Sequence, residues 1–134
     1  MANGDTTVDS PWQSIATPDP GREYLALLSD LPLRKYGKGL TVMAYARVIR
    51  MQLANTPGLI GYSFRSGLLR HRFWTLSIWE DERSLRAFVV ERPHTDAMKS
   101  LGPHMAQAEF TRWIIKGSAL PPEWDEALRH ATAK

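Results

Sequence analysis

The stretch FWTLSIWEDERSLRAFVVERPH, Phe73 to His94, decides the fold because the clearest strand of the chain is followed at once by an amphipathic helix. Side chains of a strand alternate between its two faces. One face of this strand carries Phe73, Thr75, Ser77 and Trp79, and the other carries Trp74, Leu76 and Ile78. Neither face is charged, so we expect both sides of the strand to be covered.

The residues that follow, EDERSLRAFVVER, form the predicted helix. Asp81 is placed to cap its first turn, where acidic side chains are favoured. Leu85, Phe88 and Val89 would form its buried face. Pro93 ends or kinks this helix, and a second short helical segment is expected after it.

The spacing of apolar residues, together with the prolines and glycines that end helices and strands, predicts the other elements. A first strand occupies 23–33, a helix with one broad apolar face occupies 40–53, and NTPG at 55–58 ends that helix. Further strands are expected at 59–66 and 108–117. In the tail, prolines open a helix that carries Trp124 and Leu128.

The resulting order is strand, helix, strand, strand, helix, strand. This order predicts an α+β, ferredoxin-like domain, an antiparallel sheet with helices on one face. Such a sheet leaves its other face bare, and the uncharged strands indicate that this face avoids water. We therefore expect two copies to pair their sheets in a homodimer. Residues 1–20 are predicted as an extended arm, with Trp12 as an anchor on this chain or on a partner subunit, and 21–134 as one domain.

Composition excludes several classes of protein. Among 134 residues, 43% are hydrophobic and 23% charged, which is enough for a real core. No apolar run reaches membrane-spanning length, and the N-terminus has no signal-peptide pattern, so a cytoplasmic location is the simplest prediction. The absence of cysteine removes disulfides and thiolate chemistry. The net charge is +3, and the basic residues are scattered along the sequence, which argues against a nucleic-acid partner.

Three stretches, TPGLIGYSF, FWTLSIWEDERSLRAFVVERPH with the Ala-Met that follows, and FTRWIIKG, resemble the dimeric α+β barrel superfamily. Within it they look like antibiotic biosynthesis monooxygenase-like proteins, including the spheroidene monooxygenase-like branch. The resemblance covers about 23–117. It implies a small enzyme or binding protein, because the superfamily includes cofactor-free oxygenases, heme-degrading enzymes and heme-dependent enzymes.

The heme-degrading branch uses an Asn on the first strand, a Trp on the long helix and a His on the next helical segment. The matching helix positions here are Phe88 and Met98, and the first strand, EYLALLSDLPL, has no Asn. All three positions depart from that pattern. The resemblance therefore does not imply heme degradation by that route.

Two Pro-His pairs, at 93–94 and 103–104, bracket the segment after the helix. His94 is the best candidate for chemistry, because an imidazole moves protons near neutral pH. The alternative is that His94 caps a helical turn. Met98 lies one turn further on the same face, so at most one of the two could bind a heme iron. His104 is expected on a loop.

The aromatic side chains could wall a pocket for a flat apolar ligand or simply form core; the candidates are Tyr62, Trp74, Trp79 and Phe88. Arg112 lies inside a strand, where it could pair with Glu109, pair with an acid of the other subunit, or bind an anionic substrate group. The segment 65–72 could hold an anion or be a solvated loop. No ligand spacing predicts a metal site among the four histidines.

Together these features favour a small monooxygenase-like enzyme that needs no cofactor. Its substrate would be an apolar aromatic or polyene molecule, held between sheet and helices. His94 would handle protons, Trp79, Phe88 and Met98 would wall the pocket, and Arg112 would contact an anionic group. The alternative is a non-catalytic dimer that binds a small ligand or heme.

Overall fold

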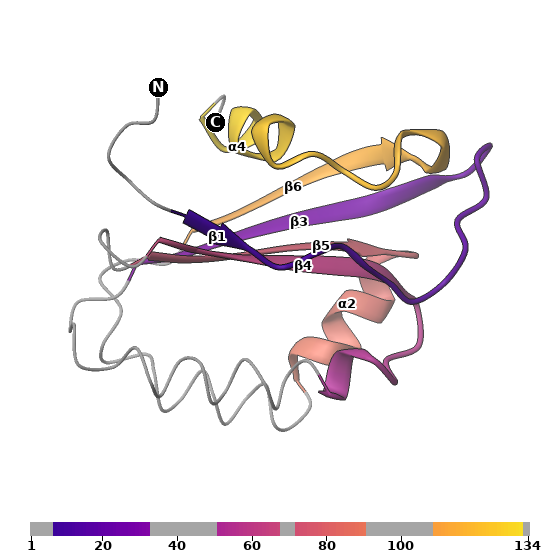
Figure 1. Ribbon diagram of the computed structural model, residues 1–134. Helices are drawn as coiled ribbons and strands as arrows, with labels where there is room; N and C mark the ends of the chain where they lie inside the picture. Colours follow the sequence, from indigo (N-terminus) through magenta and orange to yellow (C-terminus); the bar gives the residue numbers. More distant parts are fainter. Residues whose placement is uncertain (1–6, 33–50, 68–71, 91–108, 133–134) are drawn as a thin grey trace.

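The computed structural model describes residues 7–32, 51–67, 72–90 and 109–132, and the strands among them form one antiparallel sheet (Figure 1). Its four central strands are β3 (Glu23–Pro32), β4 (Leu59–Gly67), β5 (Arg72–Trp79) and β6 (Glu109–Lys116). Two short strands, β1 (Thr7–Asp9) and β2 (Gln13–Ser14), pair with β4. The described helices are α2 (Glu82–Val89), the 3-10 turn η4 (Gly117–Ala119) and α4 (Trp124–Thr132).

The strand order β4-β5-β3-β6 is the ferredoxin-like order, and it confirms the predicted α+β class. The strands predicted at 23–33, 59–66 and 73–79 are all present. Of the helix predicted at 40–53, the structure describes 51–53, which are helical. The segment predicted after Pro93 lies outside the described residues. The boundary between an arm at 1–20 and a domain at 21–134 stays a prediction.

Helix α2 begins where the sequence predicts. The Asp81 side chain accepts a hydrogen bond from the Ser84 backbone N–H at 2.8 Å. That bond, made by the charged form, lowers the pKa of Asp81 below its ordinary value of 3.8. Close to this turn, Gly58 has a φ of 84°, and a Cβ there would collide with the Ser84 side chain. Together the cap and the glycine fix how α2 leaves the sheet.

The face of the sheet beneath α2 forms one apolar core. Leu85 and Phe88 from α2 pack against side chains of β4 and β5 that alternation points toward the helix. Val89, which was predicted to be buried with them, is 40% exposed. Its buried members are Leu53, Leu59, Tyr62, Phe64, Phe73, Trp79, Leu85 and Phe88. The alternation predicted for the strand at 73–79 therefore holds on this face.

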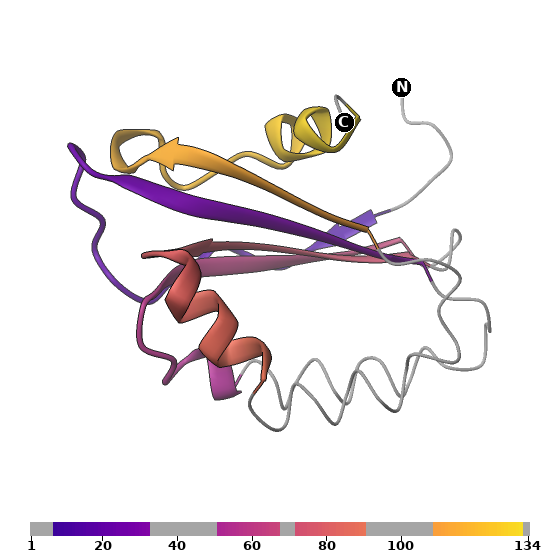
Figure 2. The ribbon, with the colours of Figure 1, turned by 180° about the vertical axis from the view of Figure 1, so that it is seen from behind.

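The opposite face is covered by side chains from the two terminal segments of the same chain. Figure 2 shows α4 on the side of the sheet opposite α2. Helix α4 lies on this face and packs Trp124, Ala127 and Leu128 against Leu76 and its neighbours. Trp12 from the N-terminal segment packs against Ile60 and the other residues of the second cluster. The bare face argued from the sequence is thus corrected: this chain covers it, so that face gives no reason of its own for a dimer.

Candidate functional site

An aromatic cluster on the α2 face contains three of the predicted pocket residues, Tyr62, Trp79 and Phe88. All three are buried, with relative exposures of 3%, 1% and 6%. The rings of Trp79 and Phe88 lie 5.4 Å apart between centroids and are tilted by 42°. This geometry is favourable for an aromatic pair and contributes beyond the buried area.

Polar groups in this cluster are few and are satisfied by their neighbours. The Trp79 indole N–H donates to the Ser77 Oγ at 2.8 Å, with both groups buried. The register of the sheet places Tyr62 directly opposite Ser77. The Ser77 hydroxyl is therefore engaged with a tryptophan. The described part of the cluster is a buried, largely apolar surface that contains the Trp79–Ser77 hydrogen bond.

Arg112 lies on the same face of the sheet, on strand β6. The register sets it opposite Leu27 of β3. Its Nη1 lies 3.5 Å from the Glu82 Oε1 at the start of α2, and its side chain is 49% exposed. Glu82 also pairs with Arg86 one turn along the helix. The partner is therefore Glu82 and not Glu109, which alternation points to the other face. The exposed pair is weak enough to leave Arg112 accessible to an anion.

Trp74 is separated from the other predicted pocket residues by the sheet itself. It is 6% exposed and packs with Leu28, Leu76 and Ala127 beneath α4. The Arg72 guanidinium carbon lies 5.8 Å from the centroid of its ring. The structure brings Tyr62, Trp79 and Phe88 together, but it does not bring Trp74 to them.

The two candidates on the Pro-His segment, His94 and Met98, lie outside the described residues, as do His71 and His104. His130 is described; its ring stacks on Trp113 at 4.4 Å between centroids. Within the described ranges, no group of three His, Asp or Glu side chains is placed to hold a metal ion. No helix among those same residues is long and apolar enough to cross a membrane.

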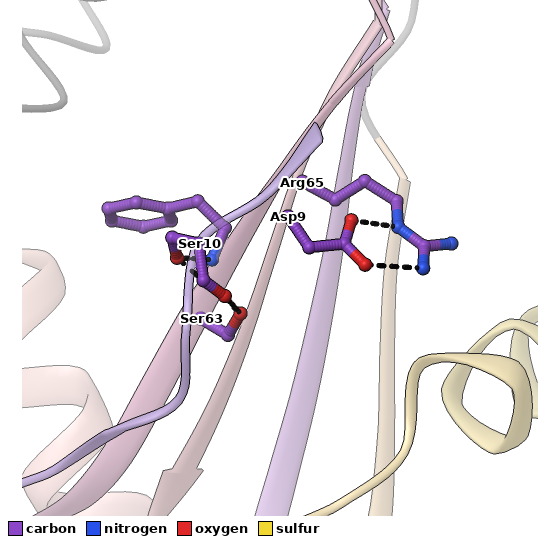
Figure 3. Close-up of polar contacts among 5 residues, drawn as sticks. Asp9, Ser10, Ser63 and Arg65 are labelled. Atoms are coloured by element: carbon purple, nitrogen blue, oxygen red, sulfur yellow. Dashed lines mark hydrogen bonds and ion pairs between the residues drawn. The ribbon is translucent and has the colours of Figure 1, made fainter. Parts of the chain in front are cut away.

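The arginines at the two ends of the predicted anion segment are both engaged by carboxylates. Arg72 donates to the Asp30 Oδ2 at 2.8 Å. Arg65 makes two hydrogen bonds to Asp9, 2.6 and 2.9 Å long (Figure 3). A guanidinium held by a carboxylate in this two-point geometry is already neutralised. These pairs argue against the segment as an anion site.

Sequence reasoning missed the junction at which Arg65 meets both terminal segments. Besides its pair with Asp9, its guanidinium carbon lies 4.8 Å from the centroid of the Trp124 ring. Asp9 lies in a segment without periodicity, and Trp124 is more than fifty positions further along the chain. No local pattern connects the three residues, so only the folded chain reveals the contact.

A shallow hollow of about 330 Å³ lies beside α4, lined by Asp125, Leu128, Arg129 and Thr132. It is open to solvent and lies on the far side of the sheet from Trp79 and Phe88. The hollow is therefore separate from the predicted pocket.

Comparison with solved structures identifies proteins of the same fold. A structure from Lactobacillus acidophilus, provisionally described as a monooxygenase, matches 79% of this chain with a TM-score of 0.65 and 6% identity. An antibiotic biosynthesis monooxygenase matches 69% of this chain and 96% of its own, with a TM-score of 0.58 and 15% identity. A protein from Nitrosomonas europaea, provisionally assigned the same name, matches 76% of this chain and 94% of its own, with a TM-score of 0.58 and 16% identity.

These likenesses confirm the fold that the sequence resemblance implied. The chain has the α+β fold of antibiotic biosynthesis monooxygenase-like structures. It spans about half the length of the first two similar structures, 49% of one and 50% of the other. Neither protein-family models nor curated proteins give a match to the sequence. At these identities the likeness establishes the fold, and activity has to be argued from the site.

Proposed function

We propose that the protein is a small monooxygenase-like enzyme that oxidises an apolar aromatic or polyene substrate on the α2 side of the sheet. The observation that carries the proposal is the buried contact of Trp79 with Phe88, beside Tyr62. A buried aromatic wall suits a flat apolar substrate. The fold shared with structures described as monooxygenases supports the same reaction class.

In this proposal each residue has a defined role. His94 accepts a proton from the substrate and so favours its oxidisable anion. Trp79, Phe88, Tyr62 and Met98 wall the pocket, and Arg112 contacts an anionic group of the substrate. Trp74, on the other face, supports the sheet and does not contact the substrate.

The oxidation balances without a resident cofactor for one class of substrate. A CH₂ group activated by its neighbours loses a proton to His94 and transfers electrons to dioxygen. One oxygen atom ends in a new C=O group, and the other leaves as water with both hydrogens. The substrate supplies all four electrons, so no separate reductant is required.

Oxygen uptake with a panel of aromatic and polyene substrates tests the enzyme. We expect uptake with at least one activated substrate and a loss of about 100-fold or more in kcat for His94→Ala, the size of a general-base contribution. His130→Ala is the matched control, because His130 stacks on Trp113 beneath α4 and should leave the rate unchanged. Equal rates for the His94 variant and the wild type would remove His94 from the mechanism.

The alternative is a non-catalytic protein whose pocket holds a small ligand or heme. The few polar groups of the aromatic wall favour binding as much as catalysis. An absorption titration with hemin separates the two, since ligation of heme iron shifts the Soret band. No shift, together with oxygen uptake on the substrate panel, would exclude the heme alternative.

A homodimer and a cytoplasmic location complete the proposal, with no nucleic-acid partner. The dimer is supported by the exposed apolar side chains Phe110 and Ile114 on β6, which are 49% and 60% exposed. Light scattering at micromolar concentration measures the mass directly. A monomer under those conditions would refute the dimer without affecting the proposed chemistry.

A further inference from the structure

The N-terminal segment 9–16 occupies the outer edge of β4 as an added strand. Its backbone follows β4 antiparallel, with Asp9 opposite Arg65 and Ser14 opposite Gly61. The Ser10 N–H donates to the Phe64 carbonyl at 2.8 Å. Addition of an extended segment to a free sheet edge is a general mode of peptide recognition.

Side chains give this edge a specific pattern. At one end, Arg65 holds the Asp9 carboxylate through two hydrogen bonds. In the middle, the Ser63 Oγ donates to the Ser10 carbonyl at 2.8 Å, and the Ser10 Oγ accepts from the Phe64 N–H at 2.9 Å (Figure 3). Ser63 is 3% exposed, so the side chain that contacts it has little space. Only a residue with a small hydrogen-bonding side chain therefore suits the Ser10 position.

At the other end, Gly61 creates a notch for Trp12. A Cβ on Gly61 would lie 2.4 Å from the Trp12 ring, so the indole occupies the space that any other residue would fill. Trp12 packs there with the cluster that contains Ile60 and Ile78. The edge therefore selects an extended segment with an acid three positions before a tryptophan.

We propose that this edge of β4 is a docking surface for the same segment of a second copy, so that two chains exchange residues 9–16. The only partner whose chemistry is shown to fit is the sequence DSPW itself, from its acid at Arg65 to its indole at Gly61. The exchanged dimer makes the same contacts as the closed chain. Its formation therefore costs association entropy rather than lost interactions.

The connection to β3 makes the exchange possible. The hydrogen bonds and the ion pair of residues 9–16 described above end on β4, whereas the chain continues through 17–22 to β3, two strands away. Four of these connecting residues, Asp19 to Arg22, are exposed. A short tether keeps its own segment at an effective concentration of about 1 mM, so exchange rises as the protein concentration approaches that value.

A chain without cysteine allows a direct test by disulfide trapping. The Oγ atoms of Ser10 and Ser63 lie 3.5 Å apart. The variants Ser10→Cys and Ser63→Cys, one of them isotope-labelled, are mixed under mild oxidation from about 10 µM to about 1 mM. In an exchanged dimer of the two variants, the thiol introduced at position 10 of one chain lies beside the thiol introduced at position 63 of the other. Their disulfide gives a covalent dimer that contains one labelled and one unlabelled chain.

We expect mixed-label pairs that increase with concentration and exceed the cross-linking of either variant alone. The Ser63→Cys variant should not cross-link by itself, because that side chain is buried. The double variant Ser10→Cys/Ser63→Cys is the geometric control and should form an internal disulfide at low concentration. If the double variant closes internally while the mixture gives no mixed-label pair, the exchange does not occur. If neither the double variant nor the mixture forms a disulfide, the docking geometry itself is wrong.

A charge reversal gives an independent measurement in solution. Asp9→Arg and Arg65→Asp each place like charges together in the closed chain, but an exchanged pair of the two variants restores opposite charges at both junctions. We expect native mass spectrometry of the mixture to show heterodimer above the statistical share. The double variant Asp9→Arg/Arg65→Asp restores the closed pair and should behave as the wild type. A heterodimer fraction no larger than the statistical share would overturn the proposal.

Discussion

The two faces of the sheet both have a buried apolar core, but they differ in the aromatic contacts that accompany it. Beneath α2, the cluster around Trp79 and Phe88 is apolar, and its described part contains a hydrogen bond from Trp79 to Ser77. The other four tryptophans lie on the opposite face, beside the buried apolar residues there; Trp74 and Trp124 contact arginines, and Trp113 stacks on His130. Both faces therefore have an apolar core, and the second adds aromatic contacts with arginines and a histidine and joins both terminal segments.

Burial alone therefore does not describe how each face is stabilised. Ionic strength does not screen apolar contacts, whereas exposed ion pairs weaken as it rises. Contacts between aromatic rings and cations should depend on salt less strongly than exposed ion pairs do. We therefore expect the two faces to respond differently to truncation, to crowding and to salt.

The largest expected effect is at the centre of the α2 face. Trp79→Ala should lower the free energy of unfolding by about 3–5 kcal/mol, because it opens a cavity in a closed core. Urea denaturation measures this loss. Trp124→Ala, on the half-buried side of α4, is the matched comparison and should cost less. A larger loss for Trp124→Ala would reverse the contrast between the faces.

A smaller effect is expected where the N-terminal segment crosses β4. Gly61→Ala should displace Trp12 and cost about 1–3 kcal/mol, because the new methyl group has no space. Limited proteolysis should then cleave within residues 9–16. Gly21→Ala, whose added Cβ would have its nearest atom at 3.6 Å, should leave both stability and cleavage unchanged. Equal behaviour of the two variants would show that the notch is not selective.

The junction at Arg65 should give an effect of about 1 kcal/mol that depends on salt. Arg65→Lys keeps the charge but loses the two-point bond to Asp9 and the broad contact with Trp124. Urea denaturation at low and high salt measures both components. Arg86→Lys, on an exposed helix pair, is the control. If Trp79→Ala showed the same salt dependence, the distinction between the faces would fail.

The smallest expected effect is at the cap of α2 and depends on pH. The pKa of Asp81 is lowered in the folded chain by its bond to the Ser84 N–H. Its contribution to stability is therefore present above its unfolded pKa, near 3.8, and is lost as the pH falls through the lower folded pKa. Asp81→Asn keeps a capping side chain without this titration. Unfolding measured through the acid range should show the difference, and parallel curves for the two proteins would contradict it.

The sequence predicted the α2 face well because its signals are local. Alternation in Phe73–Trp79, the cap at Asp81 and the buried Phe88 are each visible within a few residues, and the structure confirms all three. The same local logic predicted the tail helix with Trp124. His94 and Met98 lie outside the described residues, so their roles stay predictions.

The other face could not be predicted because its contacts join distant parts of the chain. Alternation shows that Trp74 and Ile78 are buried, but not whether a partner or a terminal segment covers them. Trp12 and Trp124 supply that cover from opposite ends of the sequence. Likewise, Arg112 was expected to pair with an acid, but its partner Glu82 follows from how α2 crosses the sheet.

Arg65 touches both ends of the described chain at once, through Asp9 and through Trp124. The two terminal segments are therefore thermodynamically coupled: whatever loosens one of them removes part of the anchor of the other. The indole of Trp124 lies at this point of coupling and is fluorescent. Its emission should change when the N-terminal segment leaves β4, on top of the emission of the other four tryptophans.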